Sequence, residues 1–301
     1  MRSLTESRTV FVLSGGGNLG AVQVGMLQAL IESGVRPNAL VGTSVGALNG
    51  AFLSGHCDLA GVEKLGDLWM SIRRGDVFPF GMGSLLRIVT GNQRSLVETT
   101  GLRNLLARAN LGFERLEEAP IPLRVIATDL ETGEPVVLRR GEIVPALLAS
   151  SAIPGIFPTV QIGGRTLVDG AMVANTPVGQ AEELNPSDIY VLCTMPARGS
   201  GPPANALGTL QRAMTLSFQQ EQRRVLAEAA TRRAVHVIPA PEVAGQISGI
   251  DFNSTRRLIS EAYELARNCL ETDGARKAHR AIQGIGGVAT ARPEPRQEAV
   301  A

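Results

Sequence analysis

The chain contains a serine whose neighbours suit nucleophilic chemistry, in the stretch GTSVG at residues 42–46. Gly42, Ser44 and Gly46 match the pattern G-x-S-x-G, which here follows an apolar segment and precedes small residues. In a nucleophile elbow, such a serine lies on a tight turn between a strand and a helix, where larger flanking side chains would collide with backbone. The helix N-terminus favours an anion there, and the N–H of Val45 would point at a developing oxyanion. The pattern therefore predicts a nucleophilic serine.

A second glycine-rich stretch, SGGGNLG at residues 14–20, follows the apolar run TVFVL. Its Gly15, Gly17 and Gly20 match G-x-G-x-x-G, which is typical of a dinucleotide-binding turn when it connects a strand to a helix. The same loop of bare N–H groups also suits an oxyanion. The stretch therefore predicts either a cofactor site or a site for a transition state.

The residues after the second predicted strand favour the oxyanion. A dinucleotide-binding fold has an acidic residue at the end of that strand, where it binds the ribose hydroxyls. Here the strand Ala39–Val41 is followed by Gly42, Thr43 and Ser44, and the nearest earlier acid, Glu32, lies within the first predicted helix. Because the carboxyl ends of parallel strands meet at one edge of a sheet, we expect the glycine loop and Ser44 to be neighbours.

Asp169 is the candidate base for this serine. The stretch RTLVDGAMVANTP at residues 165–177 places it at the end of a predicted strand, before Gly170 and Ala171. An aspartate before glycine is, taken alone, more typical of a turn or a helix cap. A serine nucleophile nevertheless needs a proton acceptor. Burial beside apolar neighbours such as Val168 would raise the pKa of the carboxyl and make it a better base.

Taken in chain order, SGGGNLG, GTSVG and DGA resemble the motifs of the patatin-like phospholipase family. The segments SSAIPGIFPT (residues 150–159) and TDLETGE (residues 128–134) are also similar to family segments, and the resemblance covers Val10 to Cys193. It implies a three-layer α/β/α fold with a mostly parallel central sheet. It also implies a serine hydrolase of the phospholipase A or lipase type, which cleaves lipid acyl esters through an acyl-enzyme without a metal or cofactor.

The resemblance further implies the roles of individual residues. Ser44 would be the nucleophile and Asp169 the base of a Ser–Asp dyad, with no histidine between them. The nucleophile elbow would be formed by Gly42 and Gly46. The oxyanion would be stabilised by backbone N–H groups of Gly15, Gly16, Gly17 and Val45.

The glycine loop departs from the family pattern at one position. Family members commonly carry Arg or Lys in the pattern G-G-G-x-R-G, whereas this chain has Leu19. The missing cation bears on substrate and rate more than on reaction class. Two alternatives to a hydrolase therefore stay open. One is a relative of the family that binds lipid without cleaving it, and the other is a nucleotide- or phosphate-binding module that uses the glycine loop.

His236 offers another candidate base. Ser44, Asp169 and His236 occur in the chain order of α/β-hydrolase triads. The histidine lies in the strand-like stretch VHVIPA, where a histidine is more often an ordinary strand residue. A triad would need His236 for activity and a Ser–Asp dyad would not.

The elements that must position these residues alternate along the chain, which predicts a three-layer α/β domain over residues 8–272. Strands are predicted at Thr9–Leu13, Ala39–Val41, Leu123–Thr128, Pro135–Leu138, Thr166–Val168, Ile189–Cys193 and Val235–Ile238. Helices are predicted at Leu19–Ser33, Ala47–Ser54, Leu59–Ile72 with Asp58 as N-cap, Ser95–Ala109, Ile143–Ser151, Val178–Leu184, Ala206–Arg233 and Ser254–Glu271. Residues 273–301 lack apolar periodicity and are predicted to be a disordered tail. The apolar stretch Phe78–Val89 is either a lid or a packed core segment.

Composition narrows the remaining possibilities. The 301 residues carry a net charge of +1 with mixed signs, so nucleic acid is not an expected partner. The three cysteines and three histidines are widely spaced, which favours reduced thiols and no metal site. No signal peptide is apparent, and no apolar run reaches the ~18 residues of a spanning helix. We expect a cytoplasmic protein that takes a lipid or acyl-ester substrate, with peripheral membrane contact and oligomeric state left open.

Overall fold

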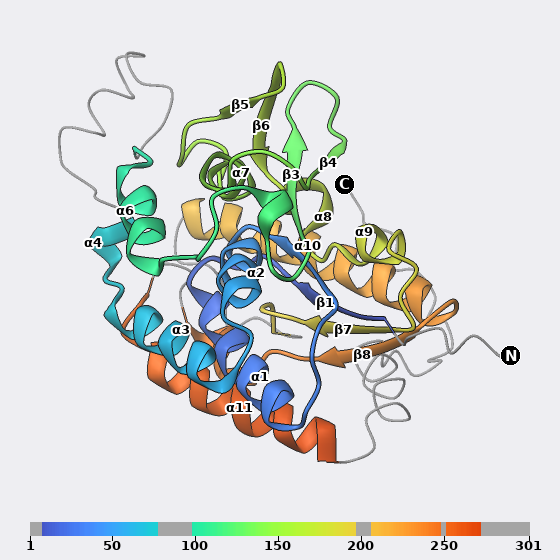
Figure 1. Ribbon diagram of the computed structural model, residues 1–301. Helices are drawn as coiled ribbons and strands as arrows, with labels where there is room; N and C mark the ends of the chain where they lie inside the picture. Colours follow the sequence, from blue (N-terminus) through green and yellow to red (C-terminus); the bar gives the residue numbers. More distant parts are fainter. Residues whose placement is uncertain (1–7, 78–97, 197–205, 248–250, 272–301) are drawn as a thin grey trace, which may run out of the picture.

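The computed structural model describes residues 8–77, 98–196, 206–247 and 251–271 (Figure 1). Its strands are β1 (Thr9–Leu13), β2 (Ala39–Thr43), β3 (Leu123–Asp129), β4 (Pro135–Leu138), β5 (Val160–Ile162), β6 (Arg165–Asp169), β7 (Asp188–Leu192) and β8 (Ala234–Ile238). Its helices are α1 (Ala21–Glu32), α2 (Val45–Gly55), α3 (Leu59–Ser71), α4 (Arg74–Val77), α6 (Thr100–Ala109), α7 (Ile143–Ser150), α8 (Ala171–Ala174), α9 (Val178–Glu182), α10 (Ala206–Ala230) and α11 (Thr255–Glu271). Single 3₁₀ turns are η1 (Gly17–Gly20), η2 (Leu116–Glu118) and η3 (Glu242–Gln246).

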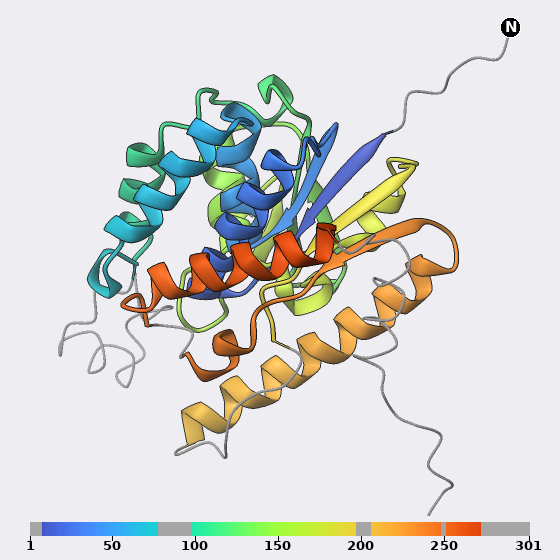
Figure 2. The same cartoon turned by 90° about the horizontal axis from the view of Figure 1, so that it is seen from below.

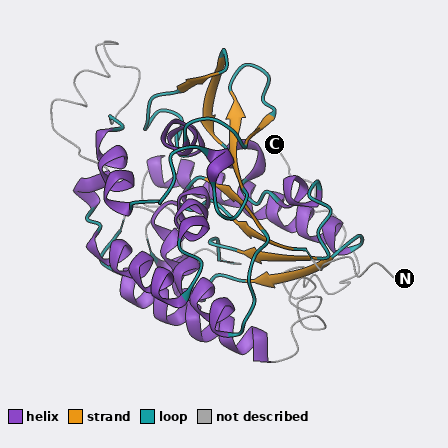
Figure 3. Ribbon diagram, in the orientation of Figure 1, coloured by secondary structure: helices purple, strands orange, loops and turns teal. Residues whose placement is uncertain are grey.

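Within these ranges, eight strands form one sheet in the order β5–β6–β3–β2–β1–β7–β8, with β4 paired to β3 (Figure 3). The five strands β3, β2, β1, β7 and β8 run parallel to one another. Strands β4 and β6 pair antiparallel with β3, and β5 pairs antiparallel with β6. The parallel strands bring the loops after β1 and β2 to the same edge of the sheet. The predicted α/β fold with a mostly parallel central sheet is confirmed.

Helices cover both faces of the sheet. Figure 2 shows α1, α3 and α11 on one side and α10 on the other. In β1, Phe11 and Leu13 belong to the core beneath the first group of helices, whereas Val10 and Val12 belong to the core beneath α9 and α10. Such strands are apolar throughout because neither side meets water, which explains their lack of alternation in the sequence.

The predicted elements are found with small shifts at their ends. Helix α2 begins at Val45, earlier than predicted, because the Ser44 carbonyl already accepts hydrogen bonds from the N–H groups of Ala47 (2.9 Å) and Leu48 (3.2 Å). Asp58 caps α3 as predicted, since its carboxylate accepts the N–H of Gly61 at 2.7 Å. The strand β5 was not predicted; it contains three residues and pairs only with β6.

Some predictions fall outside the described residues. These are the lid candidate Phe78–Val89, the start of the helix predicted from Ser95, and the tail of residues 273–301. No helix in the described ranges combines the length and apolar character that crossing a membrane requires.

Candidate active site

Ser44 lies on a strained turn between β2 and α2. Its backbone angles are φ 53° and ψ −125°, a conformation that non-glycine residues rarely adopt. The flanking glycines make the turn possible. A Cβ at Gly42 would lie 2.5 Å from the carbonyl oxygen of Gly46, and a Cβ at Gly46 would overlap the carbonyl oxygen of Leu13. The turn leaves the Ser44 hydroxyl at the N-terminus of α2.

Ser150, at the end of α7, holds this turn from the side. Its hydroxyl accepts the backbone N–H of Ser44 at 2.8 Å and donates to the carbonyl oxygen of Ile126 at 2.5 Å. Ser150 is fully buried. The strained turn is therefore anchored to β3, although Ser150 had no role assigned from the sequence beyond its place in a segment similar to the family.

Asp169 reaches Ser44 across β3. In the sheet register Thr43 pairs with Ile126, and Ala127 pairs with Asp169 on the antiparallel strand β6. Two strand spacings, roughly 10 Å, therefore separate the two backbones, and the side chains bridge this gap. The Ser44 hydroxyl donates to Oδ2 of Asp169 at 2.8 Å. The nucleophile and base candidates are thus in direct contact.

The Asp169 carboxylate is buried and held in one orientation. Its second oxygen, Oδ1, accepts the N–H of Ala171 at 2.8 Å, so that Oδ2 is left to Ser44. Burial raises the pKa of Asp169 to about 6, against the opposing effect of the hydrogen bonds from Ala171 and Ser44. A carboxylate with this pKa is ionised at neutral pH and is a stronger base than an exposed aspartate.

The glycine loop lies beside Ser44, and the structure corrects one of its expected donors. The N–H of Gly15 donates to the carbonyl oxygen of Asn175 at 3.0 Å and is therefore already used. Gly15 contributes by lacking a side chain, because a Cβ there would lie 2.7 Å from Oδ1 of Asn175 and 3.3 Å from Cβ of Ser44. In the described part of the chain, the N–H groups of Gly16, Gly17 and Val45 have no hydrogen-bond acceptor.

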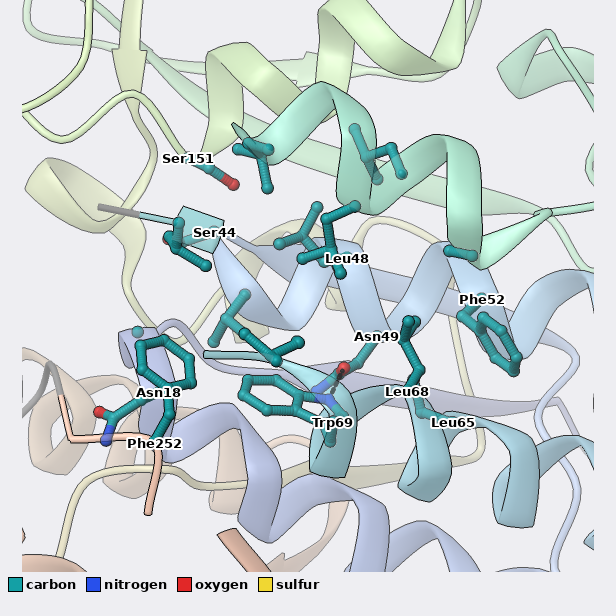
Figure 4. Close-up of a pocket in the computed structure, with 18 of the residues that line it drawn as sticks. Asn18, Ser44, Leu48, Asn49, Phe52, Leu65, Leu68, Trp69, Ser151 and Phe252 are labelled. Carbon is teal, nitrogen blue, oxygen red and sulfur yellow. Dashed lines mark hydrogen bonds between the residues drawn. The ribbon is translucent and has the colours of Figure 1, made fainter. Parts of the chain in front are cut away.

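An apolar pocket opens from Ser44 (Figure 4), and about 820 Å³ of space not filled by atoms lies along it, including the part that is open to solvent. Its walls come mainly from α2, α3, α6 and the segment after α7, and Gly17, Ser44 and Val45 also line it. None of the described lining residues carries a charged side chain. The aliphatic and aromatic side chains include Leu48, Phe52, Leu65, Leu68, Trp69, Leu105, Phe157 and Phe252. Such a wall suits an apolar chain.

Ser151 was not predicted as a site residue. It lies after α7 and lines the pocket with Ser44, and Figure 4 shows both in the same part of the pocket. Its hydroxyl is buried and has no hydrogen-bond partner within the described ranges. A buried hydroxyl in this position is free to contact a bound ester.

The two remaining candidates from the sequence lie away from this chemistry. Leu19 is 7% exposed and packs in the apolar core, so the glycine loop carries no cation at this position. His236 bonds through Nε2 to Oδ1 of Asp188 at 3.0 Å and stacks on Tyr190. Asp188 is the first residue of β7, at the opposite end of the strand from the glycine loop. His236 is therefore not placed to complete a triad.

A sequence model of the family described as patatin-like phospholipase matches residues 11–182. An uncharacterized NTE family protein of Mycobacterium tuberculosis is 28% identical over 212 residues, which are 68% of this chain and 54% of that protein. Lysophospholipase NTE1 of Cryptococcus neoformans is 30% identical over 193 residues, 64% of this chain and 11% of that protein. The chain thus spans about half the length of the mycobacterial relatives that it matches.

Among solved structures, VipD from Legionella pneumophila matches with a TM-score of 0.47 and 16% identity, covering 89% of this chain and 67% of that chain. Human GIVD cytosolic phospholipase A2 matches with a TM-score of 0.44 and 13% identity, covering 92% of this chain and 59% of that chain.

Proposed function

The chain belongs to the patatin-like phospholipase family, and from this premise we propose that it hydrolyses carboxylic esters of lipids through a Ser44–Asp169 dyad. One observation carries the proposal: the Ser44 hydroxyl, which lines an apolar pocket, donates to Asp169 at 2.8 Å. The reaction needs a nucleophile, a base and oxyanion donors around one point. We assign these roles to Ser44, to Asp169 and to the N–H groups of Gly16, Gly17 and Val45.

In the first half of the reaction, Oγ of Ser44 attacks the ester carbonyl carbon while its proton passes to Oδ2 of Asp169. The carbonyl π electrons move to the oxygen, which the N–H groups of Gly16, Gly17 and Val45 stabilise. The intermediate then breaks the bond to the alcohol oxygen. The leaving alcohol takes the proton from Asp169, and the acyl group stays on Ser44.

In the second half, water attacks the acyl-serine carbonyl and gives a proton to Asp169. The same donors stabilise the second oxyanion. Collapse of this intermediate breaks the bond to Oγ of Ser44, which recovers its proton from Asp169, and the carboxylic acid leaves. Protons and electrons balance over the cycle with no further reactant than water.

The residues at the end of β2 support nucleotide binding less well than they support ester hydrolysis. A dinucleotide-binding fold has an acid there for the ribose. Here the position is taken by Thr43, whose hydroxyl donates to the carbonyl oxygen of Ala174 at 2.7 Å, and by the strained Ser44. The geometry around the loop favours acyl transfer.

The activity is expected to rise with pH through about 6. Asp169 must be ionised to accept the Ser44 proton, and its pKa of about 6 lies above the ordinary value. Below that pH, kcat/KM is expected to fall about tenfold per pH unit, and above about pH 7 it is expected to level off. Chromatography of the released acid across pH 4 to 8 measures the profile. A profile that stays flat down to about pH 4.5, as for an unshifted aspartate, would contradict the assigned base.

The pocket is expected to bind the acyl chain of the substrate, so that changes in its wall affect long-chain esters more than short-chain esters. Leu48 lies one turn after Ser44 on α2 and lines the pocket. Leu48→Trp fills this space, so kcat/KM for p-nitrophenyl decanoate is expected to fall at least about tenfold more than for p-nitrophenyl acetate. Leu59→Trp, at an exposed leucine on α3, is the matched control and is expected to change neither. Equal losses for both esters would place the acyl chain elsewhere, and a wild type inactive on every ester of the series would overturn the proposed function.

A further inference from the structure

Two buried amide side chains lie beneath the glycine loop and bond to each other. Gln23 on α1 is 0% exposed and Asn49 on α2 is 2% exposed. The Nδ2 group of Asn49 donates to Oε1 of Gln23 at 2.9 Å. Buried polar side chains in otherwise apolar helices cost free energy unless they are fully paired, so their partners indicate what they do.

Each amide holds one end of the glycine loop. Nε2 of Gln23 donates to the carbonyl oxygen of Ser14 at 2.9 Å and to that of Leu192 at 3.2 Å. Nδ2 of Asn49 also donates to the carbonyl oxygen of Gly20 at 3.0 Å. Ser14 and Gly20 are the first and last residues of the loop, so the pair fixes both of its ends.

The orientation of both amides is determined by their partners. Oδ1 of Asn49 accepts the indole N–H of Trp69 at 2.9 Å, which requires the oxygen on that side and the NH₂ group towards Gly20. The NH₂ group of Gln23 faces two carbonyl oxygens, which leaves its oxygen for Asn49. A network of this kind has one satisfied arrangement.

The pair joins two elements that carry different oxyanion donors. Asn49 lies on α2, whose first residue is Val45, and Gln23 lies on α1, which continues from the loop containing Gly16 and Gly17. The hydrogen bond between the amides therefore sets the spacing between the two halves of the oxyanion hole. We propose that Gln23 and Asn49 are positioning residues for this hole.

This inference rests on the proposed function and predicts a loss specific to the transition state. A misplacement of donors by about 1 Å costs on the order of 10²-fold in rate, although the substrate pocket is unchanged. A merely structural role would instead lower stability and affect all ligands alike.

The test compares two ligands with the same decyl chain. With decyl trifluoromethyl ketone, Oγ of Ser44 adds to the carbonyl carbon, the proton moves to Asp169, and the carbonyl oxygen becomes an oxyanion. Decyl methyl ether has no carbonyl group and occupies only the pocket. Binding of both is followed by the fluorescence of Trp69, the single tryptophan of the chain, which lines the pocket.

Gln23→Met keeps the shape of the side chain and removes its hydrogen bonds. We expect it to weaken binding of the ketone by about 10²-fold and to lower kcat in parallel, with ether binding and KM unchanged. Asn49→Leu, at the other end of the loop, is expected to lower kcat by a similar factor. Because Asn49 also lines the pocket and accepts the indole N–H of Trp69, the comparison of the two ligands rests on Gln23→Met. The matched control is Gln28→Met on α1, whose amide bonds only to Glu32 among the described partners, at 3.0 Å, and it is expected to change neither ligand.

Each outcome decides the inference. Unchanged kcat in either variant, folded by circular dichroism, would overturn it, as would equal losses of ketone and ether binding by Gln23→Met. Loss of fold in both variants would assign the pair to the stability of the domain and overturn the positioning role. A wild type that binds ketone no more tightly than ether would instead contradict the proposed function.

Discussion

Ser44→Ala is expected to lower kcat for ester hydrolysis by roughly 10⁴- to 10⁶-fold, the largest effect of any single substitution in the site. The alanine removes the oxygen that forms the acyl-enzyme and leaves the pocket and the oxyanion donors in place. KM for slow residual turnover is therefore expected to stay close to the wild-type value.

Ser54→Ala is the matched control for this substitution. Ser54 is buried near the end of α2, the helix that begins directly after Ser44, and its hydroxyl donates to the carbonyl oxygen of Ile121 at 2.7 Å. Its loss is expected to cost about 1 kcal/mol of stability and no activity. Retention of a tenth or more of the activity by Ser44→Ala would mean that another residue is the nucleophile.

Asp169→Asn is expected to lower kcat by about 10³- to 10⁴-fold, because the amide cannot accept the Ser44 proton. The same change is expected to raise stability at pH 8. The folded state holds the pKa of Asp169 at about 6, above the ordinary 3.8, so burial of the charge destabilises the fold. This cost is absent below pH 3.8, grows as the pH rises to 6 and is complete above it, on the order of 3 kcal/mol.

The control for the second substitution is Asp129→Asn. Asp129 is another buried carboxylate, at the end of the neighbouring strand β3, and its Oδ1 accepts the N–H of Glu131 at 3.0 Å. An asparagine oxygen can accept the same bond, so kcat is expected to stay unchanged. An Asp169→Asn variant that keeps the wild-type kcat would contradict the assigned base. So would a variant whose free energy of unfolding drops between pH 4 and pH 8 by as much as that of the wild type.

The sequence was most informative where the physics is local. The elbow glycines Gly42 and Gly46 follow from steric demands within a few residues, and the structure shows the overlaps that side chains there would cause. The proximity of Ser44 to the glycine loop follows from the parallel pairing of β1 with β2. These features need only the order of strands and the geometry of one turn.

Contacts between distant segments were harder to derive. Asp169 arrives on a strand antiparallel to β3, and only the register of that pairing brings it level with Ser44. The resemblance to the family identified Asp169 as the candidate base, whereas the predicted order of strands alone would not have placed it near Ser44. The use of the Gly15 N–H by Asn175 likewise depends on how the segment after α8 crosses the loop.

The two buried amides beneath the loop can be recognised in the sequence as polar residues within apolar helices. Gln23 interrupts the apolar helix AVQVGMLQALIE, and Asn49 interrupts VGALNGAFLSG. A polar residue on a helix face that is otherwise buried signals a specific partner, because an unpaired amide there would be costly. The sequence could therefore have marked both residues, but their partners required the fold.

The central claim is that Ser44 is activated by Asp169, and labelling with a fluorophosphonate probe followed by peptide mapping tests it most directly. The probe phosphonylates activated nucleophiles, above all serine oxygens, with loss of fluoride, and reacts very slowly with ordinary serine hydroxyls. If Asp169 activates Ser44, one adduct is expected, on Ser44, at a rate that falls as the pH drops below about 6 and that is nearly lost in Asp169→Asn. An adduct on another residue, or labelling of Ser44 at an undiminished rate in Asp169→Asn, would contradict it.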